Sequence, residues 1–125
     1  HSPSLPENKE TKSGNLMKAW GGIASIQLAL PVLWTAGRKR NITHLQLCKW
    51  LCEHPAKLIG KENQIGKIAP GYDADLTIWD DNEKWTVDAN RLFHRNKLTP
   101  YDREELYGVV KKVFLNGVEQ NLSAS

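Results

Sequence analysis

A histidine and two cysteines follow one another at intervals of four residues and could bind a metal ion. His44, Cys48 and Cys52 would fall on one face of a helix, because residues four apart are neighbours there. Eight residues of helix rise about 12 Å, whereas zinc–ligand bonds are ~2 Å long. At most two of the three side chains could therefore share an ion. The alternative, which we favour, is that both cysteines are small core residues beside Leu47 and Leu51.

Other histidine and acidic side chains are weaker candidates for acid–base chemistry. Asp73 and Asp75 follow a Pro-Gly turn, where two carboxylates could transfer protons or bind Ca²⁺. Two are too few for a calcium site, and we favour the alternative that they stabilise the turn. His54 precedes a proline and His94 lies in a basic segment, and no nucleophile motif accompanies either. These side chains predict no catalytic site.

Two adjacent glycines, Gly21 and Gly22, form the best candidate ligand site. They stand just before an apolar helical pattern. Without side chains their backbone N–H groups can approach a ligand, and a helix N-terminus favours negative charge. The alternative is a tight turn that only leads into the helix.

Length and charge exclude several classes of protein. The chain has 125 residues, 40% hydrophobic and 25% charged, which is an ordinary globular composition. A complete (β/α)₈ barrel needs roughly 250 residues, so this chain is too short for one. The net charge of +3 is spread along the chain. The basic segment 91–97 contains one aromatic residue and makes a weak nucleic-acid site.

The apolar and cysteine patterns indicate in which cellular compartment the protein is expected. The longest apolar stretch, residues 21–36, is too short and too interrupted to span a bilayer. Two cysteines four residues apart are not a disulfide framework, which favours a reducing compartment, and we expect the cytoplasm. The chain begins without methionine and without a signal-peptide pattern, and we expect it to be a fragment or a trimmed product.

The first half of the chain is predicted to be helical. Apolar residues at helical spacing predict a buried helix from Ile23 to Arg38, kinked at Pro31 because proline lacks an N–H. Thr43 begins the second helix as its N-cap in a capping box, and this helix runs to about Glu53. A proline then opens a separate short helix over 55–59.

The second half is predicted to form strands. A turn at Asp81-Asn82 separates the first two, and Asn116-Gly117 is a strong hairpin signal between the last two. The order of loop, helices and strands is of the α+β kind. The predicted strands are Leu76–Asp80, Lys84–Val87, Leu106–Leu115 and Val118–Gln120.

Three segments of the chain carry recognisable motifs. They are His1-Ser2-Pro3 with Lys18–Ile23, Gly66–Leu76 with Trp79-Asp80, and His94–Tyr101 with Leu106–Val110. Together they resemble the C-terminal part of a cyclic amidohydrolase, and specifically of an allantoinase. The middle segment is shared across the superfamily, dihydroorotases and hydantoinases included, whereas the outer two narrow the resemblance to allantoinases. The resemblance covers the chain from His1 to about Glu119.

This resemblance implies an incomplete α/β fold. Residues 1–60 would be the end of an amidohydrolase (β/α)₈ barrel with its last helices, and residues 61–125 the C-terminal strands of a small β-sandwich. It implies hydrolysis of the ring amide of allantoin to allantoate, in purine catabolism. It also implies two metal ions, usually zinc, bridged by a carbamylated lysine and a hydroxide. Such ions polarise a carbonyl and supply a nucleophile at neutral pH.

The same resemblance implies substrate-binding residues only. In the family, a metal-binding aspartate directly precedes the motif matched by His1, and the histidine ligands and the bridging lysine come earlier still. No metal ligand and no catalytic residue is therefore assigned in this chain, whereas His1, Gly21 and Gly22 are assigned to substrate binding. The chain departs from the family's sequence pattern at Arg103, a turn position where the family favours glycine.

We expect the chain alone to be inactive. The parent would act on allantoin, would bind neither nucleic acid nor membrane, and would be a homo-oligomer, as is frequent in the family. The alternative is a truncated non-catalytic module that binds a protein partner through unpaired strand edges. A small nucleic-acid-binding protein is the third and weakest interpretation.

Overall fold

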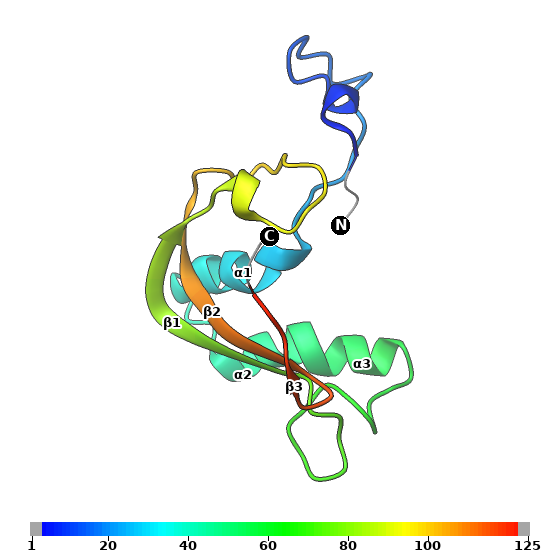
Figure 1. Cartoon of the computed structure of the whole chain (residues 1–125), viewed down its shortest axis with the longest axis vertical. Helices are drawn as coiled ribbons and strands as arrows, with labels where there is room; N and C mark the ends of the chain where they lie inside the picture. The colour runs from blue at the N-terminus through cyan, green and yellow to red at the C-terminus, as the bar shows by residue number, and fades with distance from the viewer. Residues whose placement is uncertain (1–3, 123–125) are drawn as a thin grey trace.

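Three antiparallel strands form the sheet around which the chain is arranged (Figure 1). The computed structural model describes residues 4–122. Strand β1 (Leu76–Thr86) pairs with β2 (Glu105–Leu115), and β2 pairs with β3 (Val118–Glu119). The predicted hairpin is confirmed, because Asn116 and Gly117 have φ of 50° and 78° and connect β2 to β3. A two-residue turn with both φ positive matches the right-handed twist of the strands.

The predicted turn at Asp81-Asn82 is wrong, because β1 continues through it. Asp80 pairs with Val109 and Lys84 pairs with Tyr107, so both halves of β1 follow the same partner strand. Residues 81–83 consequently bulge out of the sheet opposite a single residue of β2. Asp and Asn favour turns locally, but pairing with one long strand keeps the two segments together.

Gly108 is the residue of β2 that lies opposite this bulge. Its φ is +99°, a left-handed conformation that other residues rarely adopt. A Cβ atom at this position would lie 3.1 Å from the ring of Trp79 and 3.6 Å from Cα of Pro31. The absence of a side chain therefore lets β1 and helix α1 approach β2 closely.

Helix α1 (Ala29–Arg38) packs against β2 and is shorter than predicted. The amide of Tyr107 donates to Oγ1 of Thr35 at 2.8 Å, which fixes the helix on the strand. A 3₁₀ turn (Ile26–Leu28) precedes α1, so the predicted start at Ile23 is wrong. Pro31 is the third residue of α1, where a missing N–H removes no helical hydrogen bond. The chain therefore needs no kink there, contrary to the prediction.

The second helix is continuous where two helices were predicted. It consists of α2 (His44–Cys48), a π-helical segment (Lys49–Glu53) and α3 (His54–Leu58). The Thr43 cap is confirmed, because the amide of Gln46 donates to its Oγ1 at 3.2 Å. The amide of His54 donates five residues back, to the Lys49 carbonyl. This wider turn lets the helix continue through the proline that was expected to begin a new one.

A small core lies where the 3₁₀ turn before α1 meets the start of β2 and the segment that joins β1 to β2. Its central residues are Leu28, Val87, Leu92 and Leu106, all 6% exposed or less. Both halves of the chain contribute to it, and the division at residue 60 stays a prediction. No helix among residues 4–122 has the length and apolar character needed to cross a membrane. Several large apolar side chains remain exposed: Leu16, Met17, Ile26, Leu45, Leu58, Ile59 and Ile68.

Candidate functional site

The two glycines singled out in the sequence lie in an exposed loop rather than at a helix start. Gly22 has φ of +88°, and the first helical turn begins only at Ile26. The expected contribution of a helix dipole is therefore absent, because that dipole acts only within the first turn. What remains of the candidate site is backbone: a Cβ atom built at Gly21 has no neighbour within 4 Å.

The carbonyl oxygens of this loop converge on one side chain. Nζ of Lys9 lies 3.1 Å from the Trp20 oxygen, 2.7 Å from that of Gly21 and 2.6 Å from that of Gly22. The amide of Trp20 also donates to the Asn8 carbonyl at 2.8 Å. Sequence reasoning missed Lys9, since nothing in its neighbourhood signals a partner 11 to 13 residues away.

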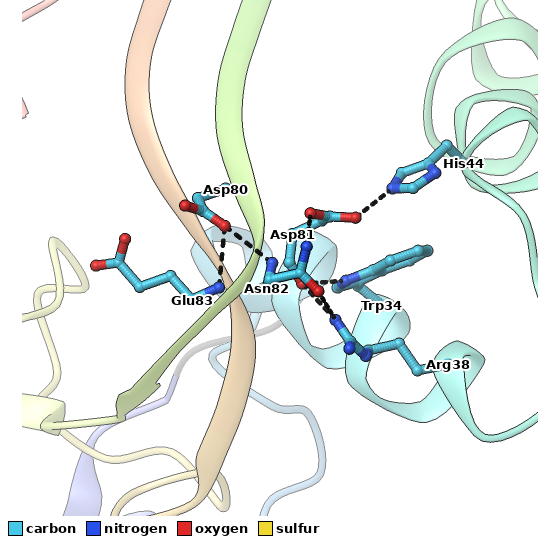
Figure 2. A network of polar contacts seen from close by, with 7 residues as sticks. All are labelled: Trp34, Arg38, His44, Asp80, Asp81, Asn82 and Glu83. Atoms are coloured by element: carbon cyan, nitrogen blue, oxygen red, sulfur yellow. Dashed lines mark hydrogen bonds and ion pairs between the residues drawn. The ribbon is translucent and has the colours of Figure 1, made fainter.

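A second polar cluster joins both helices to the bulge of β1 (Figure 2). Nε1 of Trp34 and a guanidinium nitrogen of Arg38 donate to the Asp81 carbonyl at 2.8 and 2.6 Å. Nε2 of His44 lies 2.9 Å from the Asp81 carboxylate. The bulge itself is closed by Asp80, whose Oδ1 accepts from the amides of Asn82 at 2.9 Å and Glu83 at 3.0 Å. These bonds lower the pKa of Asp80, the Asn82 amide contributing most.

Comparison with known proteins shows to which family the chain belongs. The model of the amidohydrolase family matches residues 9–119, which is most of the chain. The chain belongs to the amidohydrolase family.

Curated amidohydrolases that resemble the chain are named as allantoinases. Probable allantoinase 2 of Dictyostelium discoideum is 41% identical over 122 residues, which are 94% of this chain and 24% of that protein. The allantoinase of Saccharomyces cerevisiae is 38% identical over 94% of this chain and 25% of its own length. The chain thus spans about a quarter of the length of these relatives. The resemblance to allantoinases predicted from the motifs is confirmed.

Solved amidohydrolase structures share the arrangement of the chain. The L-hydantoinase of Arthrobacter aurescens superposes with a TM-score of 0.83 at 31% identity, over 90% of this chain and 25% of that one. The D-hydantoinase of Bacillus sp. AR9 gives 0.84 at 30% identity, over 95% and 26%. The three-stranded sheet with its packed helices is therefore compatible with part of a hydantoinase-like fold.

The described part of this amidohydrolase chain does not hold a metal site. Within residues 4–122 no three His, Cys, Asp or Glu side chains lie close enough together to bind one ion. His44, the only histidine of the predicted trio, is hydrogen-bonded to Asp81. Residues 4–122 therefore do not fit the two zinc ions that the family resemblance implies.

The cysteines are exposed, so their interpretation as core residues is wrong. Cys48 and Cys52 are both free thiols on the surface of the helix. Leu47 and Ala56 are the buried residues of this helix instead, and a neighbour one position along points about 100° away. Partial burial, and secondly the proximity of Cys48, raise the pKa of Cys52. A raised pKa disfavours the thiolate, so Cys52 is not activated as a nucleophile.

The acidic pair has a structural role, but with other partners than the Pro-Gly turn that was predicted. The amide of Asn116 donates to Oδ1 of Asp75 at 2.8 Å, and Nε2 of Gln64 donates to Oδ2 of Asp73 at 3.0 Å. Both carboxylates therefore fix loops beside the β2–β3 hairpin. Their hydrogen bonds give these carboxylates a structural use that requires no proton transfer.

His1 and Arg103 are two other residues singled out in the sequence. His1 lies outside the described range, whereas Arg103 has the backbone conformation of a turn. His1 precedes residue 4, so its assignment to substrate binding stays a prediction. Arg103 has φ of +67°, and its amide donates to the Val87 carbonyl at 2.8 Å. The family preference for glycine matches this left-handed conformation. The arginine is accommodated in the turn.

Proposed function

We propose that this chain is part of an allantoinase, a metal-dependent hydrolase that opens the ring amide of allantoin to give allantoate in purine catabolism. The supporting observation is identity of 36 to 41% to proteins named as allantoinases along 94% of the chain. The similarity to hydantoinase structures agrees with this proposal, because allantoin contains a hydantoin ring.

Within that enzyme the chain would contribute substrate contacts and outer structure. The loop with Gly21 and Gly22, together with His1, would face the ring of the substrate. Backbone groups without a Cβ can approach a planar ring closely and hydrogen-bond its amide. The zinc ions would be held by residues outside this chain. We place the enzyme in the cytoplasm as a homo-oligomer.

One experiment tests the proposal with two preparations. The full-length protein that carries this chain and the chain of 125 residues are each supplied with zinc, and allantoate release is measured. We expect turnover by the full-length protein and none above the blank by the chain alone, because its described residues lack a metal-binding set. Hydantoin and dihydrouracil as competing substrates establish which ring is preferred. Full-length protein that leaves allantoin intact would refute the proposal.

A non-catalytic role has one observation in its favour. Strand β1 has 11 residues and pairs on one side only within residues 4–122, and Ile78 on it is half exposed. An unpaired edge of this length can accept a strand from another protein. Two results together would support this alternative. The full-length protein would be inactive on allantoin, and the β1 amides would exchange more slowly with solvent once a partner protein is bound.

A further inference from the structure

The ammonium of Lys9 is saturated by backbone oxygens of a single loop. A lysine ammonium has three N–H donors, and three consecutive carbonyls, those of residues 20–22, lie within 3.1 Å of it. Charge-assisted hydrogen bonds of this kind are roughly twice as strong as neutral ones. The loop is thereby clamped to the segment that carries Lys9, and the bond from Trp20 to Asn8 closes the same junction.

This clamp decides which polar groups the loop presents. All peptide bonds of the described residues are trans, so the C=O and N–H of each peptide unit point in opposite directions. When the carbonyls of residues 20–22 turn toward Lys9, the N–H groups of Gly21, Gly22 and Ile23 must turn away from it. None of these three N–H groups donates to an acceptor within residues 4–122. The loop therefore offers hydrogen-bond donors, while its acceptors are occupied.

The glycines make this arrangement possible. Positive φ at Gly22 turns the backbone so that successive carbonyls face the same side. Gly21, Gly22 and Ile23 are all exposed, so the outward N–H groups are accessible.

We propose that Lys9 is a positioning residue for substrate binding. It holds the carbonyls of the loop so that the N–H groups of Gly21, Gly22 and Ile23 face outward and bind carbonyl oxygens of a cyclic ureide. Lys9 itself does not touch the substrate. The inference rests on the proposed function, in which this loop contacts the ring. Without the ammonium the peptide units rotate freely, and the loop presents acceptors as readily as donors.

The test compares three variants of the full-length protein. Lys9→Met removes the donors and keeps most of the side-chain volume. Lys9→Arg keeps the charge but replaces a three-donor ammonium with a planar fork. Lys12→Met is the matched control, because Lys12 is an exposed lysine in the same segment. The readouts are kcat and KM on allantoin and the exchange rate of the Trp20 amide, which reports the junction without any turnover.

For Lys9→Met we expect a KM at least tenfold higher, a smaller change in kcat and Trp20 exchange at least tenfold faster. Lost binding of the ground state and transition state alike raises KM rather than lowering kcat. Lys9→Arg should restore part of both effects, and Lys12→Met should match the unchanged protein. Unaltered KM and exchange in Lys9→Met, or equal effects from Lys12→Met, would overturn the inference.

Failure of the proposed function gives a different pattern. In that case the unchanged protein does not hydrolyse allantoin, whereas Lys9→Met still accelerates exchange of the Trp20 amide. That result overturns the role of Lys9 in substrate binding and leaves it as a structural clamp. An active unchanged protein with normal kinetics in Lys9→Met overturns only the inference about Lys9.

Discussion

Asp81 and His44 connect the bulge of β1 to helix α2 across 37 residues of sequence, with Oδ2 and Nε2 2.9 Å apart. The carbonyl of the same Asp81 accepts from Trp34 of α1, so one residue of the bulge binds both helices. The ring of Trp34 lies 4.4 Å from that of His44 and meets the Trp79 ring edge-on at 5.4 Å. The bulge is therefore a junction at which both helices meet the sheet, beside the Thr35–Tyr107 contact of α1 with β2.

Burial predicts that the members of this junction contribute unequally to stability. Trp34 is 6% exposed, whereas the side chain of His44 is 59% exposed. We expect Trp34→Ala to lower the free energy of unfolding by about 3–5 kcal/mol, as for other buried aromatic residues. His44→Ala should cost about 1 kcal/mol or less, because exposed ion pairs contribute little. Urea unfolding of the full-length protein measures both. Equal costs would show that the hydrogen bond to Asp81, not burial, holds the junction.

Gly66 is predicted to be intolerant of any side chain. Its φ is +95°, and a Cβ atom there would lie 2.7 Å from Cβ of Ala56 and 2.9 Å from the Cys52 carbonyl oxygen. Gly60 is the matched control, with φ of +68° and nothing within 4 Å of its Cβ position. Gly60→Ala carries only the backbone cost of about 1–2 kcal/mol. Gly66→Ala should cost a further ~1–3 kcal/mol from overpacking against the helix. Equal unfolding midpoints for the two variants would contradict this.

Asp80 should make the stability of the bulge depend on pH. Its pKa in the folded protein lies below the usual 3.8, because the carboxylate accepts the amides of Asn82 and Glu83. A lowered folded pKa gives stability that is complete above the unfolded pKa and is lost as pH falls through the folded one. Asp80→Asn keeps an acceptor oxygen but does not titrate. The difference in Tm between the two proteins should be constant above about pH 5 and should shrink below the usual carboxyl pKa. A difference that stays undiminished well below the usual carboxyl pKa would exclude Asp80 as its source.

Local signals were sufficient where a single turn decides the conformation. The Asn116-Gly117 hairpin and the Thr43 cap were both predicted, because each depends on residues within three positions of one another. The left-handed turn at Arg103 also followed from the family pattern. In these places the intrinsic preference of the residues and the final fold agree.

Long-range contacts decided the features that the sequence could not predict. Asp81-Asn82 has the composition of a turn, yet pairing of both flanks with β2 converts it into a bulge. The exposed position of Cys48 depends on which helix residue faces the sheet. The same holds for Lys9, whose partners are set by the path of the loop. Residue preferences alone carry no information about such partners.

The isolated chain is predicted to associate in solution. Its core is small, and Ile26, Leu45, Leu58 and Ile59 are each more than 60% exposed. Large apolar side chains exposed in this number favour association and the binding of hydrophobic dyes. Size-exclusion chromatography and dye fluorescence of the 125-residue chain should show oligomers and strong dye binding. The full-length protein under the same conditions is the control. A monomeric chain with no dye signal and a sharp thermal transition would refute the prediction.

Gly22 is predicted to affect the substrate and not the metal. At φ of +88° a β-branched residue is strained, so Gly22→Val displaces the loop and introduces methyl groups beside the ring. We expect kcat/KM on allantoin to fall about tenfold or more, equivalent to ~1.4 kcal/mol of transition-state binding.

Gly60→Val is the control for this variant, because Gly60 also has a left-handed φ (+68°) and an open Cβ position but lies outside the binding loop. Steady-state kinetics and zinc analysis of the purified full-length variants measure both effects. The zinc content of Gly22→Val should equal that of the unchanged protein, since no described residue near the loop belongs to a metal-binding group. Lost zinc would mean that the loop supports the metal site. Unaltered kinetics would mean that the glycine pair is only a turn leading into the 3₁₀ segment before α1.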